Sequence, residues 1–280
     1  MYKIIKREEL NNTVTLLEIE APYVAKKSEP GQFIILRVNE DSERIPLTIA
    51  DFDREKGTVS IIFQIVGSST MLLNNKKEGD SIADFAGPLG NPSKLNDLKN
   101  VCVIGGGVGN AIALPLVKKL SKLGTKVTSI VGFRNKELVI LEEQFKANSD
   151  NFIIVTDDGS YGEKGNVTMP LERLLKAGEK FDEVITIGPL IMMKFVSELT
   201  KKYNIKTTVS MNPIMIDGTG MCGGCRLTVD GKTKFACVDG PDFDGHLVDF
   251  DEVMSRNKMY SEFEKRKREE TCNLFNKEAK

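Results

Sequence analysis

A run of glycines between an apolar strand and a helix constrains the fold of this chain most strongly. Residues 101–104 are apolar, Gly105-Gly106-Gly107-Val108-Gly109 follows directly, and residues 111–123 show helical spacing. A second apolar strand at 126–131 completes a βαβ unit. Backbone N–H groups in such a turn can hold a pyrophosphate, because no Cβ keeps it away. The pattern also fits a plain tight connection between strand and helix.

Further strands extend this unit into a sheet. Buried-type strands are expected at 152–156, 183–187 and 206–210, with helices at 168–177 and 191–203 between them. Five such strands predict a doubly wound parallel sheet. Arg134 follows the second strand, where an arginine either contacts a nucleotide ribose or 2′-phosphate, or is simply solvated.

The chain before this sheet has a different hydrophobic pattern. Up to about residue 92, short alternating apolar runs such as 32–38 and 58–66 are separated by turns rich in glycine and proline. This pattern predicts antiparallel β structure, and a small barrel in particular. At the other end, residues 251–280 are charged and helical in propensity, so we expect a helix that packs or binds a partner and has a frayed end.

Three cysteines crowd into one glycine-rich segment. Cys222, Cys225 and Cys237 supply three thiols, and Asp217 lies five positions before the first of them. The four positions reproduce the plant-type two-iron spacing, with aspartate in the first place. This spacing favours an iron-sulfur cluster. Zinc remains an alternative, because structural zinc sites also use paired cysteines. His246 is an alternative fourth ligand. A hairpin with an Asp-Gly turn is expected within this segment.

The two other cysteines are not expected to bind metal. Cys102 lies in an apolar strand and is expected to be a small core residue. Cys272 lies in the charged tail and is expected to have no role.

Composition disfavours several classes of function. Lys plus Arg number 39 against 40 Asp plus Glu, so there is no overall positive charge for nucleic acid. The N-terminus becomes charged before an apolar signal region forms, and no stretch approaches the roughly 18 apolar residues of a membrane span. A cytoplasmic protein without nucleic-acid or membrane binding is expected. With 280 residues and 40% hydrophobic content, about two domains are expected.

Together these features resemble the ferredoxin-reductase-like electron-transfer subunits over roughly residues 1–250. The barrel contains Arg44-Ile45-Pro46-Leu47-Thr48, similar to the family's Arg-Pro-x-Ser/Thr flavin segment, although the arginine stands one place early. A Gly-x-Gly-Thr turn is matched with serine in place of the second glycine, and the segment 87–91 resembles the one that closes the barrel. The sheet contains the family's GGGxG turn and its DDGSxGxxG loop, and Ile187 stands where many members have cysteine before Gly-Pro.

The resemblance implies three sets of site residues. FAD is expected at Arg44, Pro46, Leu47, Thr48, Gly67, Ser68, Ser69 and Thr70, with Thr48 near flavin N5. NAD(H) is expected at Gly105, Gly106, Gly107, Gly109, Arg134, Asp157, Asp158, Gly159, Gly188 and Pro189. A 2Fe-2S cluster is expected at Asp217, Cys222, Cys225 and Cys237. No side chain is expected to act as an acid, base or nucleophile.

The resemblance also implies an order of domains. They are an FAD-binding barrel at 1–95, an NAD(H)-binding α/β domain at 96–212, a 2Fe-2S module at 213–250 and a charged tail at 251–280.

The implied function is electron transfer. Such a subunit exchanges hydride with NAD(H) through FAD and passes single electrons through the cluster to a larger flavin and 4Fe-4S subunit. Asp217 favours the group of the NADH-dependent ferredoxin:NADP oxidoreductase small subunit and the sulfide dehydrogenase β subunit, with ferredoxin and NADP(H) as indirect partners. The alternatives are an electron-transfer subunit of dihydroorotate dehydrogenase, whose members usually have four cysteines, and a zinc-stapled, non-catalytic nucleotide-binding module.

Overall fold

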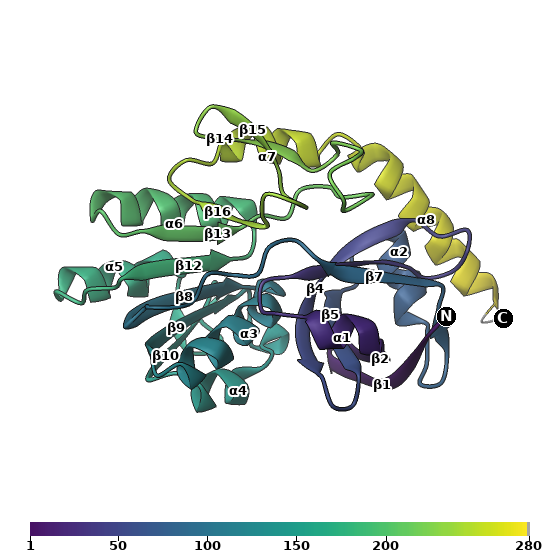
Figure 1. Ribbon diagram of the computed structural model, residues 1–280, viewed down its shortest axis with the longest axis horizontal. Helices are drawn as coiled ribbons and strands as arrows, with labels where there is room; N and C mark the ends of the chain where they lie inside the picture. The colour runs from purple at the N-terminus through teal and green to yellow at the C-terminus, as the bar shows by residue number, and fades with distance from the viewer. Residues whose placement is uncertain (279–280) are drawn as a thin grey trace.

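The computed structural model describes residues 1–278, and it describes side chains up to residue 272. The final two residues of the predicted tail, 279–280, lie outside this range. Figure 1 shows a β-barrel beside an α/β sheet, with a smaller glycine-rich module spanning the two. The predicted fold class, a barrel followed by a doubly wound sheet and a small C-terminal module, is confirmed.

Seven antiparallel strands form the barrel, in the spatial order β6-β1-β2-β5-β4-β3-β7. Apolar side chains alternate along them: in β2, Leu17 and Ile19 are fully buried while Glu18 between them is partly exposed. Two short helices accompany the barrel, α1 (Pro22–Lys27) and α2 (Ser68–Asn74). The strands are β1 (Tyr2–Asn11), β2 (Val14–Glu20), β3 (Phe33–Arg37), β4 (Arg44–Asp53), β5 (Thr58–Gln64), β6 (Ser81–Ile82) and β7 (Asp84–Leu89).

The second sheet has the order β11-β10-β9-β8-β12-β13-β16. The five predicted strands are its parallel centre, and the short β11 joins them in parallel. The last strand, β16, runs antiparallel at the other edge. The strands are β8 (Asn100–Gly106), β9 (Lys126–Phe133), β10 (Asn151–Thr156), β11 (Glu163–Lys164), β12 (Glu183–Ile187), β13 (Thr207–Ser210) and β16 (Asp242–Asp244).

Helices cover both faces of this sheet. In β8, Val101 and Val103 pack in the core that contains α3, whereas Cys102 and Ile104 pack in the core that contains α5 and α6. This alternation confirms the doubly wound arrangement, and Cys102 is a fully buried core residue as expected. The helical segments are α3 (Gly109–Lys122), the 3₁₀ turn η1 (Lys136–Leu138), α4 (Glu142–Ala147), α5 (Thr168–Lys176) and α6 (Leu190–Lys202).

The glycine-rich module is built on the predicted hairpin. Strands β14 (Arg226–Val229) and β15 (Lys232–Phe235) are joined by Asp230 and Gly231, whose φ angles of 51° and 68° suit a tight type I′ turn. The chain then returns through β16, which pairs with β13 of the nucleotide sheet, and ends in α7 (Phe250–Asn257) and α8 (Ser261–Glu278). The module is therefore hydrogen-bonded to the sheet as well as packed on it.

Helix α8 runs from this module down the outside of the barrel (Figure 1) and lies along α2. Cys272 of α8 places its Sγ 3.9 Å from Sδ of Met71. It is therefore a packing contact rather than the bystander expected from its charged surroundings. No helix within residues 1–278 is long and apolar enough to cross a membrane.

One buried carboxyl links all three parts of the molecule. Asp242 begins β16, and its Oδ2 accepts a hydrogen bond of 2.5 Å from Ser93, in the segment that joins barrel to sheet. Asp242 also pairs across the sheet with Ser210, at the end of β13. Its other oxygen, Oδ1, has no partner in the described chain. Burial raises the pKa of Asp242 from 3.8 to about 6.

We predict that Asp242→Asn alters the pH dependence of stability. Because the pKa of Asp242 is higher in the folded state, its ionisation lowers the free energy of unfolding. The loss is absent near pH 4, grows between pH 4 and 6, and is constant above pH 6. That constant is about 3 kcal/mol. Urea unfolding from pH 4 to 8 should show the variant gaining stability relative to wild type across this window. A constant difference at every pH would contradict the prediction.

Candidate functional site

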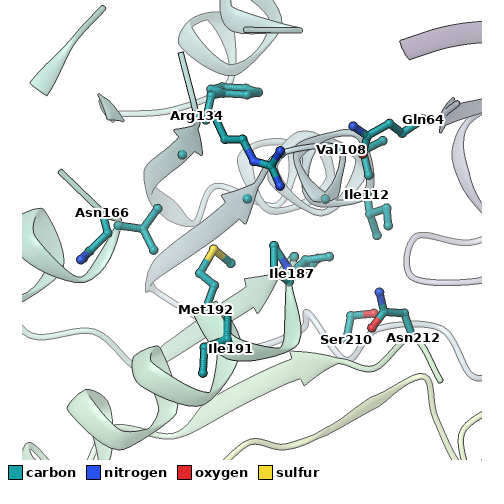
Figure 2. A pocket seen from close by; sticks show the side chains of 18 of the residues that line it. Gln64, Val108, Ile112, Arg134, Asn166, Ile187, Ile191, Met192, Ser210 and Asn212 are labelled. Carbon is teal, nitrogen blue, oxygen red and sulfur yellow. The ribbon is translucent and has the colours of Figure 1, made fainter. Parts of the chain in front are cut away.

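A cavity of about 1110 Å³ separates the barrel from the carboxyl edge of the sheet. Both parts contribute to its walls, as does the segment that follows β13 (Figure 2). Ligand sites in open α/β sheets lie at this edge, where the strands end. Of the predicted residues, the cavity brings together Pro46, Leu47, Thr48, Gly106, Gly107, Gly109, Arg134, Asp157, Gly188 and Pro189.

The glycine turn presents its backbone to this cavity. Gly107 has a φ of +55°, and a Cβ added to it would meet no atom within 4 Å, so the space before it is open. Gly109 serves packing instead, because its Cβ would lie 2.5 Å from the carbonyl oxygen of Ile187. The turn thus combines an open approach for a ligand with a close approach of α3 to β12.

Two side chains of opposite charge stand at neighbouring strand ends. Arg134 follows β9 and Asp157 follows β10, and the N–H of Asp157 donates to the carbonyl of Phe133 at 3.0 Å. Figure 2 shows Arg134 extended into the cavity. A guanidinium and a carboxylate here can recognise phosphate and ribose groups respectively.

Other predicted nucleotide residues shape this edge without lining the cavity. Gly105 lies beneath Asn110, which fills the space where a Cβ would stand. Asp158 accepts the N–H of Ser160 at 2.9 Å, and Gly159 has a φ of +77°, so both form the loop after β10. Hydrogen bonding from Ser160 holds the pKa of Asp158 below its ordinary value.

Sequence reasoning missed the wall formed by α5, α6 and the segment after β13. The spacing of Ile191, Phe195, Glu198 and Lys202 places them on one face of α6, and this periodicity was a usable signal. Ser210, Met211 and Asn212 stand at or just after the carboxyl end of β13, so the predicted strand at 206–210 was a usable signal for them as well. The wall also includes Asn166, Thr168, Glu172, Met192, Leu199, Pro213 and Met215.

Strand β4 carries the predicted flavin segment. Ile45 and Leu47 pack against the barrel core, so Arg44, Pro46 and Thr48 lie on the outward face of the strand. Arg44 is exposed and lies outside the cavity, which begins at Pro46. Arg44 therefore shares a face of the strand with Pro46 and Thr48, which line the cavity together with Leu47.

The turn at residues 67–70 also lies outside the cavity, at the start of α2. Thr70 Oγ1 accepts the N–H groups of Val66 and Gly67, both at 3.0 Å, and so shapes the turn. Ser69 donates to the carboxylate of Glu43 at 2.9 Å, which ties the turn to the residue preceding Arg44. Arg44 and this turn thus form a second locus, reached from the cavity along β4.

The glycine-rich module brings two thiols into contact. Sγ of Cys225 and Sγ of Cys237 lie 3.2 Å apart, and neither is in a disulfide. Burial raises the pKa of Cys237 to about 12. Since a metal binds the thiolate, metal binding at Cys237 would displace the thiol proton. Within the part of the chain that is described, no group of three or more His, Cys, Asp or Glu side chains converges around one point.

Backbone donors point at these sulfurs. The N–H of Gly224 lies 3.4 Å from Cys222 Sγ, and the N–H of Cys237 lies 3.5 Å from Cys225 Sγ. N–H donors to sulfur are a feature of iron-sulfur sites and help to set their potentials. The donor set and its surroundings therefore fit a thiolate-bound cluster, with the loop that carries Cys222 still to close around it.

The predicted ligand Asp217 and the alternative ligand His246 have different hydrogen-bond partners. Asp217 accepts the N–H of Thr219 at 2.9 Å, and the bonds from Thr219 lower its pKa, with a smaller contribution from the charge of Arg44. His246 instead places Nε2 3.0 Å from Oγ1 of Thr200, on α6. Ligation by Nε2 of His246 would require this contact to be broken.

The module packs directly on the barrel beside the flavin strand. A Cβ on Gly218 would lie 2.6 Å from Ile35 and 2.9 Å from Leu89, so only glycine permits this approach. Phe33 and Ile35 of β3 share one apolar core with Cys225 and Cys237. Since Phe33 pairs with Thr48, packed side chains connect the predicted flavin position to the thiols.

We predict that Gly109→Ala damages the dinucleotide site. The added methyl group would press on Ile187 and displace the start of α3, at a cost of about 1–3 kcal/mol in unfolding free energy. Affinity for NADH, measured by calorimetry, should fall at least tenfold. Ser121→Ala on the exposed end of the same helix is the control, and equal behaviour of the two variants would refute the prediction.

Comparison with known proteins identifies the family. Residues 212–249 match the iron-sulfur cluster binding domain of dihydroorotate dehydrogenase B. The chain is 46% identical to a Thermotoga maritima homologue of the dihydroorotate dehydrogenase B (NAD(+)) electron transfer subunit, over 94% of this chain and 93% of that protein. The corresponding subunit of Streptococcus pneumoniae (strain R6) is 33% identical, over 86% and 94% respectively.

A solved structure agrees with these relatives. A chain in the structure of NADH-dependent reduced ferredoxin-NADP oxidoreductase, described in work on flavin-based electron bifurcation, superposes with a TM-score of 0.91. The identity is 44%, and the match covers 96% of this chain and 97% of that one. The resemblance drawn from the motifs is therefore confirmed, and the chain belongs to the ferredoxin-reductase-like family of dihydroorotate dehydrogenase B electron-transfer subunits and their homologues.

Proposed function

We propose that this chain is the NAD(H)-oxidising electron-transfer subunit of a larger complex of the NADH-dependent ferredoxin:NADP oxidoreductase kind. The observation that carries the proposal is the single cavity in which strand β4 faces the glycine turn and Gly188-Pro189. A flavin on β4 and a nicotinamide at the sheet edge would meet there. The proposed order of domains, 1–95, 96–212, 213–250 and 251–280, follows the same logic.

The chain's own residues would bind and orient the cofactors. Thr48 and Pro46 would flank the flavin ring, while the backbone of Gly107 would face the nucleotide phosphates. Bound FAD would exchange hydride with NAD(H), and a bound 2Fe-2S cluster would carry one electron at a time. The walls of α6 and the segment after β13 would exclude water from the space between the two rings.

Arg44 would extend the flavin site away from the cavity. Thr48 lies four positions further along the strand, which corresponds to about 13 Å along β4. The turn at residues 67–70 lies beside it, joined through the bond between Ser69 and Glu43. We therefore assign the diphosphate of FAD to Arg44 and this turn, and its ring system to Pro46, Leu47 and Thr48.

Asp217, Cys222, Cys225 and Cys237 would hold the cluster. The two thiols in contact, the N–H groups directed at sulfur and the match to an iron-sulfur binding domain support this assignment over zinc. Closure of the segment from Asp217 to Cys222 would complete the set. Gly218 would keep the cluster against the barrel, close to the flavin.

The partner would be a larger subunit that contains flavin and 4Fe-4S clusters, and through it ferredoxin and NADP(H). The similarity to the ferredoxin-NADP oxidoreductase structure and the aspartate at position 217 support this partner. The names of several relatives favour a dihydroorotate dehydrogenase instead. Co-purification with an iron-sulfur flavoprotein or with an FMN-containing dehydrogenase would distinguish these partners.

Anaerobically purified protein should show flavin bands with a broad iron-sulfur absorption, and NADH should bleach both. Cys237→Ser should lose the iron-sulfur absorption while NADH still bleaches the flavin, because the serine removes one thiolate from the cluster and leaves the cavity intact. The control is Cys102→Ser, which lies in the nucleotide sheet away from the module. A colourless protein that binds zinc, even after reconstitution with cofactors, would replace this proposal with a zinc-stapled nucleotide-binding module.

Asp217→Cys should retain the cluster and change its reduction potential. A thiolate donates more electron density to iron than a carboxylate does, so the electronic environment of the cluster changes with this ligand. Electron paramagnetic resonance during a redox titration would measure the change. An unchanged potential and an unchanged spectrum would show that Asp217 is not a ligand.

A further inference from the structure

The C-terminal helix α8 is attached to the barrel at one small contact. Its described residues are exposed with two exceptions, Thr271 and Cys272, and Thr271 is only 4% exposed. Both contact the first turn of α2. The contact falls on the turn at residues 67–70, to which we assign the FAD diphosphate.

The hydrogen bonds at this contact have a defined direction. Thr271 Oγ1 lies 2.9 Å from the carbonyl of Lys267 and donates its only hydrogen to it. Ser68 Oγ lies 2.7 Å from the same Thr271 oxygen, so Ser68 is the donor in that pair. Sγ of Cys272 lies against Sδ of Met71, one helical turn away. The Ser68 hydroxyl thus donates its hydrogen bond to Thr271 of α8.

The other side of the turn is held by the barrel. Ser69 donates to Glu43, and Thr70 accepts the N–H groups of Val66 and Gly67. Within residues 1–272, the N–H groups of Ser68 and Ser69 donate to no acceptor. A Cβ added to Gly67 would meet nothing within 4 Å, so the approach to the turn is open. The turn is therefore held from both sides, and two of its backbone donors have no partner among the described side chains.

We propose that α8 acts as a clamp on the binding site for the FAD diphosphate. Thr271 accepts a hydrogen bond from the hydroxyl of Ser68 and thereby holds the turn at residues 67–70 in its binding conformation. This inference rests on the proposed flavin function. Preorganisation of this kind raises affinity because the turn need not be ordered when the ligand binds. Thr271 is a positioning residue in this arrangement, since it acts through Ser68.

Thr271→Val in the full chain removes the hydroxyl at nearly constant volume. Loss of one buried hydrogen bond should raise the dissociation constant for FAD about three- to tenfold, measured by fluorescence on flavin-free protein. Riboflavin has the same ring system and no diphosphate, so its dissociation constant should not change. Thr271→Ser should behave as wild type, and Thr233→Val on exposed β15 is the matched control.

A double-mutant cycle with Ser68→Ala tests whether the pair acts as a unit. The double variant should lose no more FAD affinity than either single variant, because both remove the same bond. Unchanged FAD affinity in Thr271→Val, or equal loss of FAD and riboflavin affinity, would overturn the clamp. Wild-type protein that binds neither flavin would instead overturn the proposed function, so the two failures are distinguishable.

Discussion

The architecture depends on an apolar core to which all three parts of the molecule contribute. Phe33 and Ile35 come from the barrel, Val209 from the nucleotide sheet, and Cys225 and Cys237 from the glycine-rich module. Burial of apolar surface is the dominant favourable term in folding, so a core shared in this way fixes the three parts relative to one another. The cavity and the thiols are close because both border this core.

Much of the fold was predictable because periodicity reports burial directly. The five central strands, the glycine turn and the Asp-Gly hairpin were each assigned from local pattern, and the structure contains all of them. The pairing of β16 with β13 was not predictable in this way, because a three-residue strand has too little pattern to be recognised. That pairing is what joins the glycine-rich module to the edge of the nucleotide sheet.

The sites divide along the same line. Residues in strand ends and glycine turns were found from the sequence, since each motif lies directly next to the strand or helix that positions it. Thr271 was missed, and Cys272 was expected to have no role, because a contact between residues about 200 positions apart leaves no local signal. His246 was a candidate ligand by chemistry alone, and nothing in the sequence indicated that its Nε2 would lie beside Thr200 of α6.

The return of β16 to the nucleotide sheet has a mechanical consequence. The same strand that closes the cysteine module is hydrogen-bonded to β13, whose neighbour β12 leads into Gly188 and Pro189. A shift of the sheet edge on nucleotide binding would therefore pull on the module through covalent and hydrogen-bonded chain rather than through a flexible linker. An attachment this direct holds the cysteine module at a fixed position relative to the strand ends that border the cavity.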